Sequence, residues 1–308
     1  MEWSDMTSQA HCCQFYPCTT ARQFLEYLNP LETERWKNSI HVFRGQPDAE
    51  FGLVPSAHRR QGEVTAARYY GNQDISCNDQ VEFEKAVIKA FIAACDRAGL
   101  AIPGDSPQVR QQLDPIDELI GTSQEWPDPA MYNLLAFAQH HGVPTCLLDW
   151  TRSSYIAAYF AAASALSSLN DDQAILTGSL AVWALSTRVR EVSFAQPPGA
   201  TSPYLAAQSG LFTVSRTEGN SNDIFTERRL ELRACDFSGP DAPFHLQCVT
   251  LPKTEAGELL ACCESVGVSG VTLFPGYEGI AKSIRDWARI RHKWPGSYEA
   301  STRYLLSE

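Results

Sequence analysis

The sequence lacks any apolar run long enough to span a membrane, because no stretch approaches the roughly 20 residues that a transmembrane helix requires. Its first residues, Met1 to Met6, carry neither the basic segment nor the apolar core of a signal peptide. We therefore expect a cytoplasmic protein that does not contact a membrane.

An excess of positive charge is also missing, since 25 lysines and arginines face 36 aspartates and glutamates, for a net charge of -11. This balance argues against a broad nucleic-acid-binding face, although it leaves room for a local basic site. With 308 residues, of which 44% are hydrophobic, the chain is able to bury a substantial core. Disorder is therefore excluded as the general state of the chain.

Cysteine pairs at the C-x-x-C spacing of zinc sites are absent from a chain that holds ten cysteines. Two pairs, Cys12–Cys13 and Cys262–Cys263, are directly adjacent, which is a poor chelating geometry. His11, Cys12, Cys13 and Cys18 leave a metal site open as an alternative. We expect no metal, and we interpret the cysteines as reduced, small core residues.

Apolar periodicity and turn residues predict short strands that do not alternate strictly with helices. The expected helices cover residues 20–28, 80–98, 128–139, 154–164, 255–266 and 277–291, and the expected strands cover 39–43, 179–185, 210–214, 245–252 and 271–275. This order predicts an α+β fold of mixed or antiparallel strands with packed helices. We divide the chain into a poorly ordered lead-in (1–20), one domain (21–295) with a helical insertion near 60–130, and a tail (296–308).

Polar groups are concentrated between Ala138 and Thr151, directly before an apolar helix. Because burying such groups costs free energy unless each is paired, this density predicts a functional site. His140 is a candidate acid, base or ligand donor, and capping of a helix C-terminus is its alternative. Asp149 and Thr151 either bind a ligand or cap the following helix, and Trp150 either stacks on a ring or fills the core.

Two further segments carry candidate binding residues. Arg44 stands at the end of a predicted strand, where its planar guanidinium suits phosphate or carboxylate, with a surface salt bridge as the alternative. Gly45 beside it allows close approach of a ligand to the backbone. Gln208 precedes another strand and suits a ribose hydroxyl or a base edge, although a turn role is also open. For Glu278 we favour stabilisation of a helix dipole over catalysis.

Four ordered blocks within residues 22–290 resemble the FRG domain family, named for its Phe-Arg-Gly motif. They are Phe43-Arg44-Gly45 with Leu53-Val54-Pro55-Ser56 and Arg59, Ala138 to Thr151 with Ala158 to Ala161, Ala207 to Thr213, and Leu273 to Ala281. Cys146 stands where the family usually has arginine. The resemblance implies a bacterial protein from a setting that suggests phage defence or toxicity.

A second similarity, to mono-ADP-ribosyltransferases, implies a split sheet and NAD as the substrate. By this similarity Arg44 grips the dinucleotide, Thr151 supports the nicotinamide pocket, and Gln208 orients the ribose or the acceptor. Asp149 then supplies negative charge and His140 a base. Gln46, Trp150 and Phe212 complete the expected binding residues, together with Gly45. The acceptor is a protein or a nucleic acid. The glutamate typical of active transferases is not found at position 208.

Three functions therefore remain open at this point. The first is an NAD-dependent ADP-ribosyltransferase or glycohydrolase, in which Arg44, His140, Asp149 and Gln208 act in catalysis. The second is a non-catalytic sensor of a nucleotide or of a phage component, which uses the same pocket. The third is a hydrolytic, nuclease-like toxin that uses His140 and Asp149. The sequence leaves the oligomeric state open.

Overall fold

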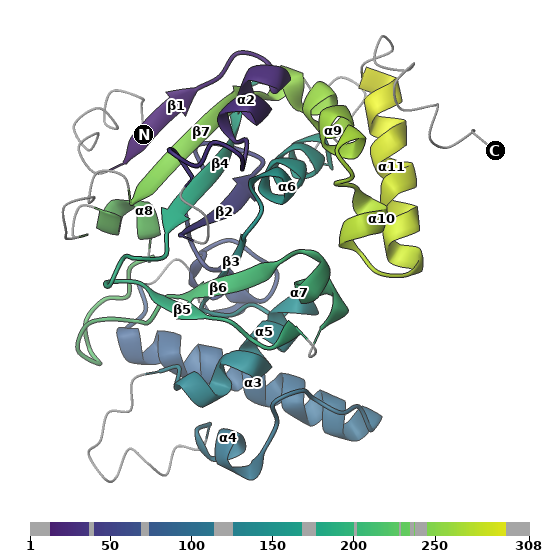
Figure 1. Ribbon diagram of the computed structural model, residues 1–308. Helices are drawn as coiled ribbons and strands as arrows, with labels where there is room; N and C mark the ends of the chain where they lie inside the picture. Colours follow the sequence, from purple (N-terminus) through teal and green to yellow (C-terminus); the bar gives the residue numbers. More distant parts are fainter. Residues whose placement is uncertain are drawn as a thin grey trace.

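A computed structural model describes residues 13–36, 40–68, 74–113, 126–167, 177–199, 202–227, 229–234, 237 and 245–293. Its centre is a seven-stranded sheet in the order β1-β7-β4-β2-β3-β6-β5 (Figure 1). The strands are β1 (Gln14–Pro17), β2 (His41–Gln46), β3 (Leu147–Thr151), β4 (Ser179–Ser186), β5 (Ser193–Ala195), β6 (Gly210–Val214) and β7 (Leu246–Pro252). β1 runs parallel to β7, and all other neighbours are antiparallel. The mixed sheet and its helices confirm the predicted α+β class.

Among neighbouring strands of the sheet, β2 and β3 share the fewest residue pairs. One residue pair, Phe43 with Thr151, joins these strands, whereas six pairs join β2 to β4 and five join β3 to β6. The strands separate beyond Phe43, at the point where β2 carries Arg44. The sheet is therefore divided into a β1-β7-β4-β2 half and a β3-β6-β5 half.

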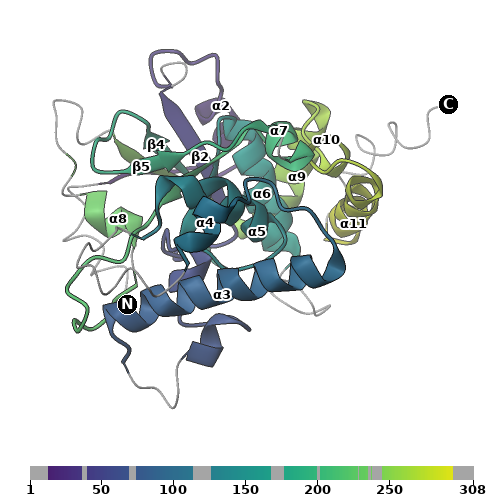
Figure 2. The same cartoon turned by 90° about the horizontal axis from the view of Figure 1, so that it is seen from below.

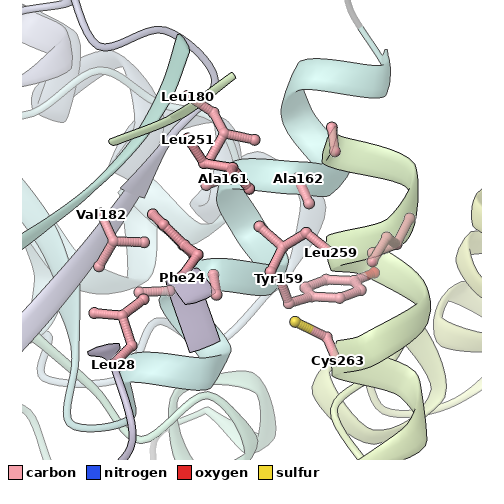
Figure 3. Packing of buried hydrophobic residues seen from close by; sticks show 14 of the residues in the cluster. Phe24, Leu28, Tyr159, Ala161, Ala162, Leu180, Val182, Leu251, Leu259 and Cys263 are labelled. Atoms are coloured by element: carbon pink, nitrogen blue, oxygen red, sulfur yellow. The ribbon is translucent and has the colours of Figure 1, made fainter. Parts of the chain in front are cut away.

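Helices α2 (Ala21–Tyr27), α6 (Ser154–Ser167) and α9 (Ala256–Ser265) cover the first half. The many alanines of α6 let it approach the sheet closely, and a Cβ added at Gly45 would lie 2.0 Å from the Ala157 carbonyl oxygen. Tyr159 of α6 packs near Leu259 and Cys263 of α9, with Phe24 and Val182 in the same cluster (Figure 3). α11 (Tyr277–Lys293) lies against α9, and the Tyr159 hydroxyl donates to Asp286 Oδ2 at 2.5 Å.

Helices α3 (Cys77–Ala98) and α5 (Tyr132–His140) accompany the second half, with the short α4 (Pro107–Gln111) nearby (Figure 2). α3 begins with a capping box between Ser76 and Asp79, and it ends at Gly99, whose φ of 67° is left-handed. The side chains of Ile88, Leu134 and other residues join Leu147 and Phe212 in one buried cluster.

The opposite face of the sheet carries a third cluster, which runs under both halves. It contains Leu148 and Trp150 of β3 and Trp183 of β4, and it is covered by Leu53 and by Leu230 of α8 (Leu230–Arg233). The remaining elements are α7 (Pro203–Ala207), α10 (Gly270–Leu273) and the 3-10 turns η1 (Ser56–His58), η2 (Thr65–Arg68), η4 (Pro129–Met131) and η8 (Lys253–Glu255). In the described part of the chain, no helix has both the length and the apolar character needed to cross a membrane.

Three local expectations differ from the structure. Residues 271–275 were expected as a strand, but Gly270–Leu273 forms helix α10, because Ser269 and Thr272 make a reciprocal cap at its start. β1 lies within the lead-in, for which we expected no regular element, and it is held by pairing with β7. β2 continues to Gln46, so Arg44 lies inside this strand and not at its end. The expected tail, 296–308, lies outside the described residues, and the division into domains stays a prediction.

Candidate functional site

Arg44 lies where the sheet opens between β2 and β3. Its Nη1 atom donates to the backbone oxygen of Asp149 at 2.8 Å and lies 3.5 Å from Asp149 Oδ2. The side chain is 15% exposed, and its buried Nε has no hydrogen-bond partner among the described residues. Burial lowers the pKa of Arg44, nearby Arg59 lowers it further, and Asp149 opposes the shift. This guanidinium therefore retains a donor for an additional acceptor.

Asp149 is held by an extended hydrogen-bond network. Its Oδ1 accepts from Gln139 Nε2 at 2.7 Å, and the Thr145 hydroxyl donates to Gln139 Oε1. The Thr145 amide donates to Ser56 Oγ at 3.1 Å, which links η1 to the same network. Although its position is fixed in this way, the Asp149 side chain is 60% exposed. A ligand is therefore able to reach this carboxylate.

A pocket of about 70 Å³ lies beside Asp149, between α5, β3, β6 and the segment around α7. Its lining includes five of the predicted site residues, namely His140, Asp149, Trp150, Gln208 and Phe212. The structure thus gathers residues from two regions that are distant in the sequence, 136–150 and 202–212. Arg44 adjoins this group through its contacts with Asp149.

His140 lines the pocket and packs against Tyr204, which lies behind it. Their ring centroids are 4.3 Å apart, and the Tyr204 hydroxyl donates to Glu278 Oε2 at 2.9 Å. Burial lowers the pKa of His140, as does the adjacent His141, whereas Glu278 and Asp149 oppose the shift. The neutral imidazole is therefore favoured, which suits a base or a hydrogen-bond acceptor.

Thr151 and Gln208 connect separate parts of the site. The Thr151 hydroxyl donates to the Gln208 carbonyl oxygen at 2.7 Å, and Gln208 Nε2 donates to the Leu273 carbonyl oxygen at 3.2 Å. These bonds join β3, the end of α7 and α10. Both polar groups therefore hold the walls of the pocket in place.

Three of the predicted binding residues have clear packing roles. The side of Gly45 that lacks a Cβ faces α6, so the structure explains this glycine by helix packing and not by ligand approach. Gln46 is 4% exposed; it accepts from Trp183 Nε1 at 3.0 Å and donates to the Gly52 carbonyl oxygen at 3.2 Å. Trp150 is 3% exposed and donates from Nε1 to Thr213 Oγ1 at 3.0 Å.

Capping of α6 does not explain Asp149. The amide of Ile156 donates to Ser153 Oγ at 3.3 Å, and the amide of Ser153 donates to Thr151 Oγ1 at 3.1 Å. Ser153 and Thr151 thus satisfy the start of the helix, while the Asp149 carboxylate is bonded to Gln139. The ligand-binding alternative for Asp149 is therefore favoured over the capping one.

Buried polar residues also surround Glu84 of α3, which is 3% exposed. Its carboxylate is 3.1 Å from His58 Nε2 and accepts from Gln80 at 2.6 Å and Trp126 at 2.8 Å. Burial raises the pKa of the Cys146 thiol well above its usual value, and Glu84 raises it further. Cys146 is therefore a packing residue in this cluster and not a reactive thiol.

Several residues of the site were not singled out individually from the sequence. Gln139 and Thr145 lie within the block from Ala138 to Thr151. Their polar side chains near His140 were the sequence feature that could have identified them as site residues. Tyr204 carried no such signal, and Glu278 was interpreted as a helix-dipole residue. The contact of Glu278 with Tyr204 joins residues 74 positions apart, so it depends on the tertiary fold.

Metal ligands do not form a cluster in the part of the chain that the structure describes, where no group of three or more His, Cys, Asp or Glu residues is placed to hold an ion. His11 and Cys12, which belong to the alternative metal group, lie outside the described residues.

Comparison with known proteins gives one match. Residues 39–169 match the sequence model of the FRG domain, which spans β2, α3, α5, β3 and α6. No curated protein and no solved structure matches the chain.

Proposed function

The chain contains an FRG domain in residues 39–169, and from this premise we propose that the pocket beside Asp149 binds NAD and cleaves it, as an ADP-ribosyltransferase or glycohydrolase. The convergence of the four sequence blocks carries the proposal. Arg44 contacts Asp149, Thr151 contacts Gln208, and Tyr204 beside this block contacts Glu278. Blocks that serve only the core would not need to meet around one exposed carboxylate.

The proposed reaction breaks the bond between the nicotinamide nitrogen and C1′ of the ribose. The electron pair leaves with nicotinamide, and positive charge develops on the sugar. The Asp149 carboxylate stabilises this charge because it is already held in place by Gln139. The acceptor's nucleophilic atom then bonds to C1′, and neutral His140 takes its proton. Water as the acceptor gives hydrolysis, and a protein or nucleic-acid group gives transfer.

Arg44 is the residue that we assign to the dinucleotide phosphates. Its guanidinium is anchored through Nη1 to the backbone of β3, while the buried Nε lacks a partner among the described residues. A phosphate oxygen would satisfy this donor and offset the cost of burying the charge. The same contact would hold the ribose beside Asp149.

The ligand must enlarge the pocket as it binds. A cavity that holds benzene has a volume of about 150 Å³, which exceeds the 70 Å³ available beside Asp149. His140 lines the pocket, and its ring lies 4.3 Å from that of Tyr204 at a tilt of 43°, so these are the rings that a planar ligand group would displace. Nicotinamide would then stack in the place that one of these rings occupies.

One observation favours the sensor as a second candidate function. Gln208, which stands where active transferases have a glutamate, donates its amide to the Leu273 backbone. A side chain bound in this way supports the pocket wall and supplies no negative charge. A protein with this arrangement would bind the nucleotide without cleaving it.

The test is incubation of the purified chain with NAD, with nicotinamide release followed by chromatography and binding followed by calorimetry. We expect release from the wild type, and its loss in Arg44→Gln. Arg60→Gln is the matched control, because Arg60 is 56% exposed and pairs with Asp74 away from the pocket. Binding without release would support the sensor, and the absence of both would refute the NAD proposal.

A role in phage defence or toxicity forms a separate part of the proposal. If the chain consumes NAD or modifies a host component, its overexpression should slow bacterial growth, and His140→Ala should relieve the effect. Growth that is equally slow with both forms would exclude toxicity through this pocket. The hydrolytic-toxin alternative would instead require cleavage of a nucleic acid, measured on purified RNA and DNA.

A further inference from the structure

A second and larger cavity, of about 500 Å³, lies at the end of the sheet where β2 begins and β4 ends. Its walls come from β1, β2, β4 and β7 and from α2 with the segment after it, which Figure 1 shows together. It shares no lining residue with the pocket beside Asp149. Its volume falls within the range of about 300–1,000 Å³ that is typical of small-molecule sites.

The sheet changes from apolar to polar where it forms the floor of this cavity. Phe43 pairs with Ala184 in the core, and the next residues on the same face, His41 and Ser186, also pair and line the cavity. Gln247, opposite Ala184 on β7, adds an amide. Ser186 and Gln247 are each only 4% exposed. The Ser186 hydroxyl oxygen already accepts from the Arg188 amide at 3.3 Å, so it is held in place as part of a polar floor.

One wall of the cavity is aromatic. The rings of Tyr16 and Tyr27 lie 4.7 Å apart, and Trp36 packs edge-on against Tyr27 at 5.9 Å and against His41 at 5.4 Å. These contacts fix the orientation of Tyr27 and His41. The wall therefore offers a rigid surface for a planar group.

Positive charge gathers around the cavity, although the chain as a whole has a net charge of -11. Two arginines, Arg35 and Arg188, line it against one carboxylate, Glu34, among the described lining residues. Arg35 is oriented in advance, because its guanidinium carbon lies 4.1 Å from the centroid of the Tyr27 ring and its Nη1 donates to the Tyr27 carbonyl oxygen at 3.0 Å. Arg188 is exposed and lies at the rim.

We propose that this cavity is a binding site for a small anion that carries an aromatic or heteroaromatic ring. The anionic group is held by Arg35 and Arg188, the ring packs on the tyrosine wall, and the buried amide and hydroxyl of the floor read its polar substituents. A nucleoside monophosphate and an aromatic carboxylate share this chemistry. The site is independent of the NAD pocket and of the activity proposed for it.

Calorimetry on the full chain tests the proposal, with AMP and UMP as phosphate probes and indole-3-acetate as the carboxylate probe. Adenosine is the uncharged counterpart of AMP. We expect at least one of the three anions to bind, and adenosine to bind at least about tenfold more weakly than AMP if the phosphate class is the one bound. Binding of indole-3-acetate alone would assign the carboxylate class.

Arg188→Gln should weaken binding of the anion about tenfold, because it removes a charge-assisted contact. Arg190→Gln is the matched control, since Arg190 is also exposed but does not line the cavity. Arg44→Gln should leave binding of the anion to this cavity unchanged, and Arg188→Gln should leave nicotinamide release unchanged. Failure of one proposal can therefore be told apart from failure of the other. Absence of binding by all three anions, or equal losses in Arg188→Gln and Arg190→Gln, would overturn the inference.

Discussion

Asp149 combines a fixed position with an accessible charge, and this combination separates it from buried acidic residues such as Glu84 and Asp286. Its Oδ1 is bonded to Gln139, while the side chain remains 60% exposed. Asp149→Asn keeps an acceptor at Oδ1 and removes the charge. If the carboxylate stabilises the cationic sugar, nicotinamide release should fall at least about 100-fold. Chromatographic initial rates at saturating NAD measure this effect.

The control for that substitution is Asp74→Asn. Asp74 is 55% exposed and pairs with Arg60, so it resembles Asp149 in exposure but lies away from the pocket. We expect Asp74→Asn to keep the wild-type melting temperature within a few degrees, because exposed ion pairs contribute at most about 1 kcal/mol. Thermal unfolding of Asp149→Asn is measured beside it to separate lost turnover from lost folding. Undiminished nicotinamide release by Asp149→Asn would remove the carboxylate from the proposed mechanism.

Glu84 stabilises the fold in a way that depends on pH. Its burial favours the neutral acid, but bonds from His58, Gln80 and Trp126 outweigh burial and lower the pKa of Glu84 below its ordinary value of 4.5. A lowered pKa in the folded state means that the stabilisation is present above pH 4.5 and is lost as the pH falls through the lowered value. Glu84→Gln should therefore cost about 3 kcal/mol at pH 7, because an amide cannot accept from all three donors.

Urea unfolding of the wild type and of Glu84→Gln, at pH 7 and at successively lower pH, measures this difference. The difference in the free energy of unfolding between the wild type and Glu84→Gln should become smaller as the pH falls below 4.5. Glu82→Gln is the control, since Glu82 lies on the same helix with 44% of its side chain exposed. A gap that stays constant with pH would show that the charge of Glu84 does not stabilise the fold.

At the scale of elements, the close approach of α6 to β2 depends on Gly45. A methyl group there would lie 2.0 Å from the Ala157 carbonyl oxygen and 2.7 Å from the Ala161 nitrogen, and backbone atoms cannot rotate away. Gly45→Ala should therefore lower the free energy of unfolding by about 3 kcal/mol. In Gly199→Ala the nearest atom would be 3.6 Å away, so thermal unfolding of this control should match the wild type.

Element prediction from the sequence succeeded where local signals agreed with the tertiary fold. α3 had a stripe of apolar residues and a glycine at its end, and both features are found in the structure. It failed for α10, where Val271 and Thr272 favoured a strand and the Ser269 cap prevailed. β1 was not predicted because its residues show no strand pattern of their own. It is held in the sheet by pairing with β7, which lies more than 200 residues away in the sequence.

The candidate site was predictable to a similar degree. Arg44, His140, Asp149 and Gln208 were identified from their polar character within turn or strand contexts, and the structure brings them close together. The sequence did not distinguish Gln46 and Trp150 from ligand-binding residues. Their buried hydrogen bonds, with Trp183 and Thr213, join residues far apart in the sequence and leave no local pattern. Glu278 was assigned to a helix dipole, because its exposed contact with Tyr204 joins residues 74 positions apart and depends on the tertiary fold.

At the scale of the whole molecule, the two halves of the sheet should differ in stability. β4 pairs over its length with both β2 and β7, whereas β3 pairs fully with β6 but meets β2 at Phe43 alone. Amides of β3 should therefore exchange with solvent faster than those of β4 in native-state hydrogen exchange. Addition of NAD should slow the exchange in β3 if the ligand fills the gap between the halves. Equal protection of the two strands in the free protein would contradict this view.

The position of β4 also has a consequence for where the functional unit begins and ends. Residues 39–169 match the family model, yet the strand that borders β2 on its other side comes from Ser179–Ser186. A fragment cut to the matched range would leave the β2 edge bare and discard α7 and β6, which help to line the pocket. Open edges of this kind pair with other chains and aggregate. The region recognisable by similarity is therefore shorter than the unit that folds, and deletion analysis guided by the match alone would report loss of folding as loss of activity.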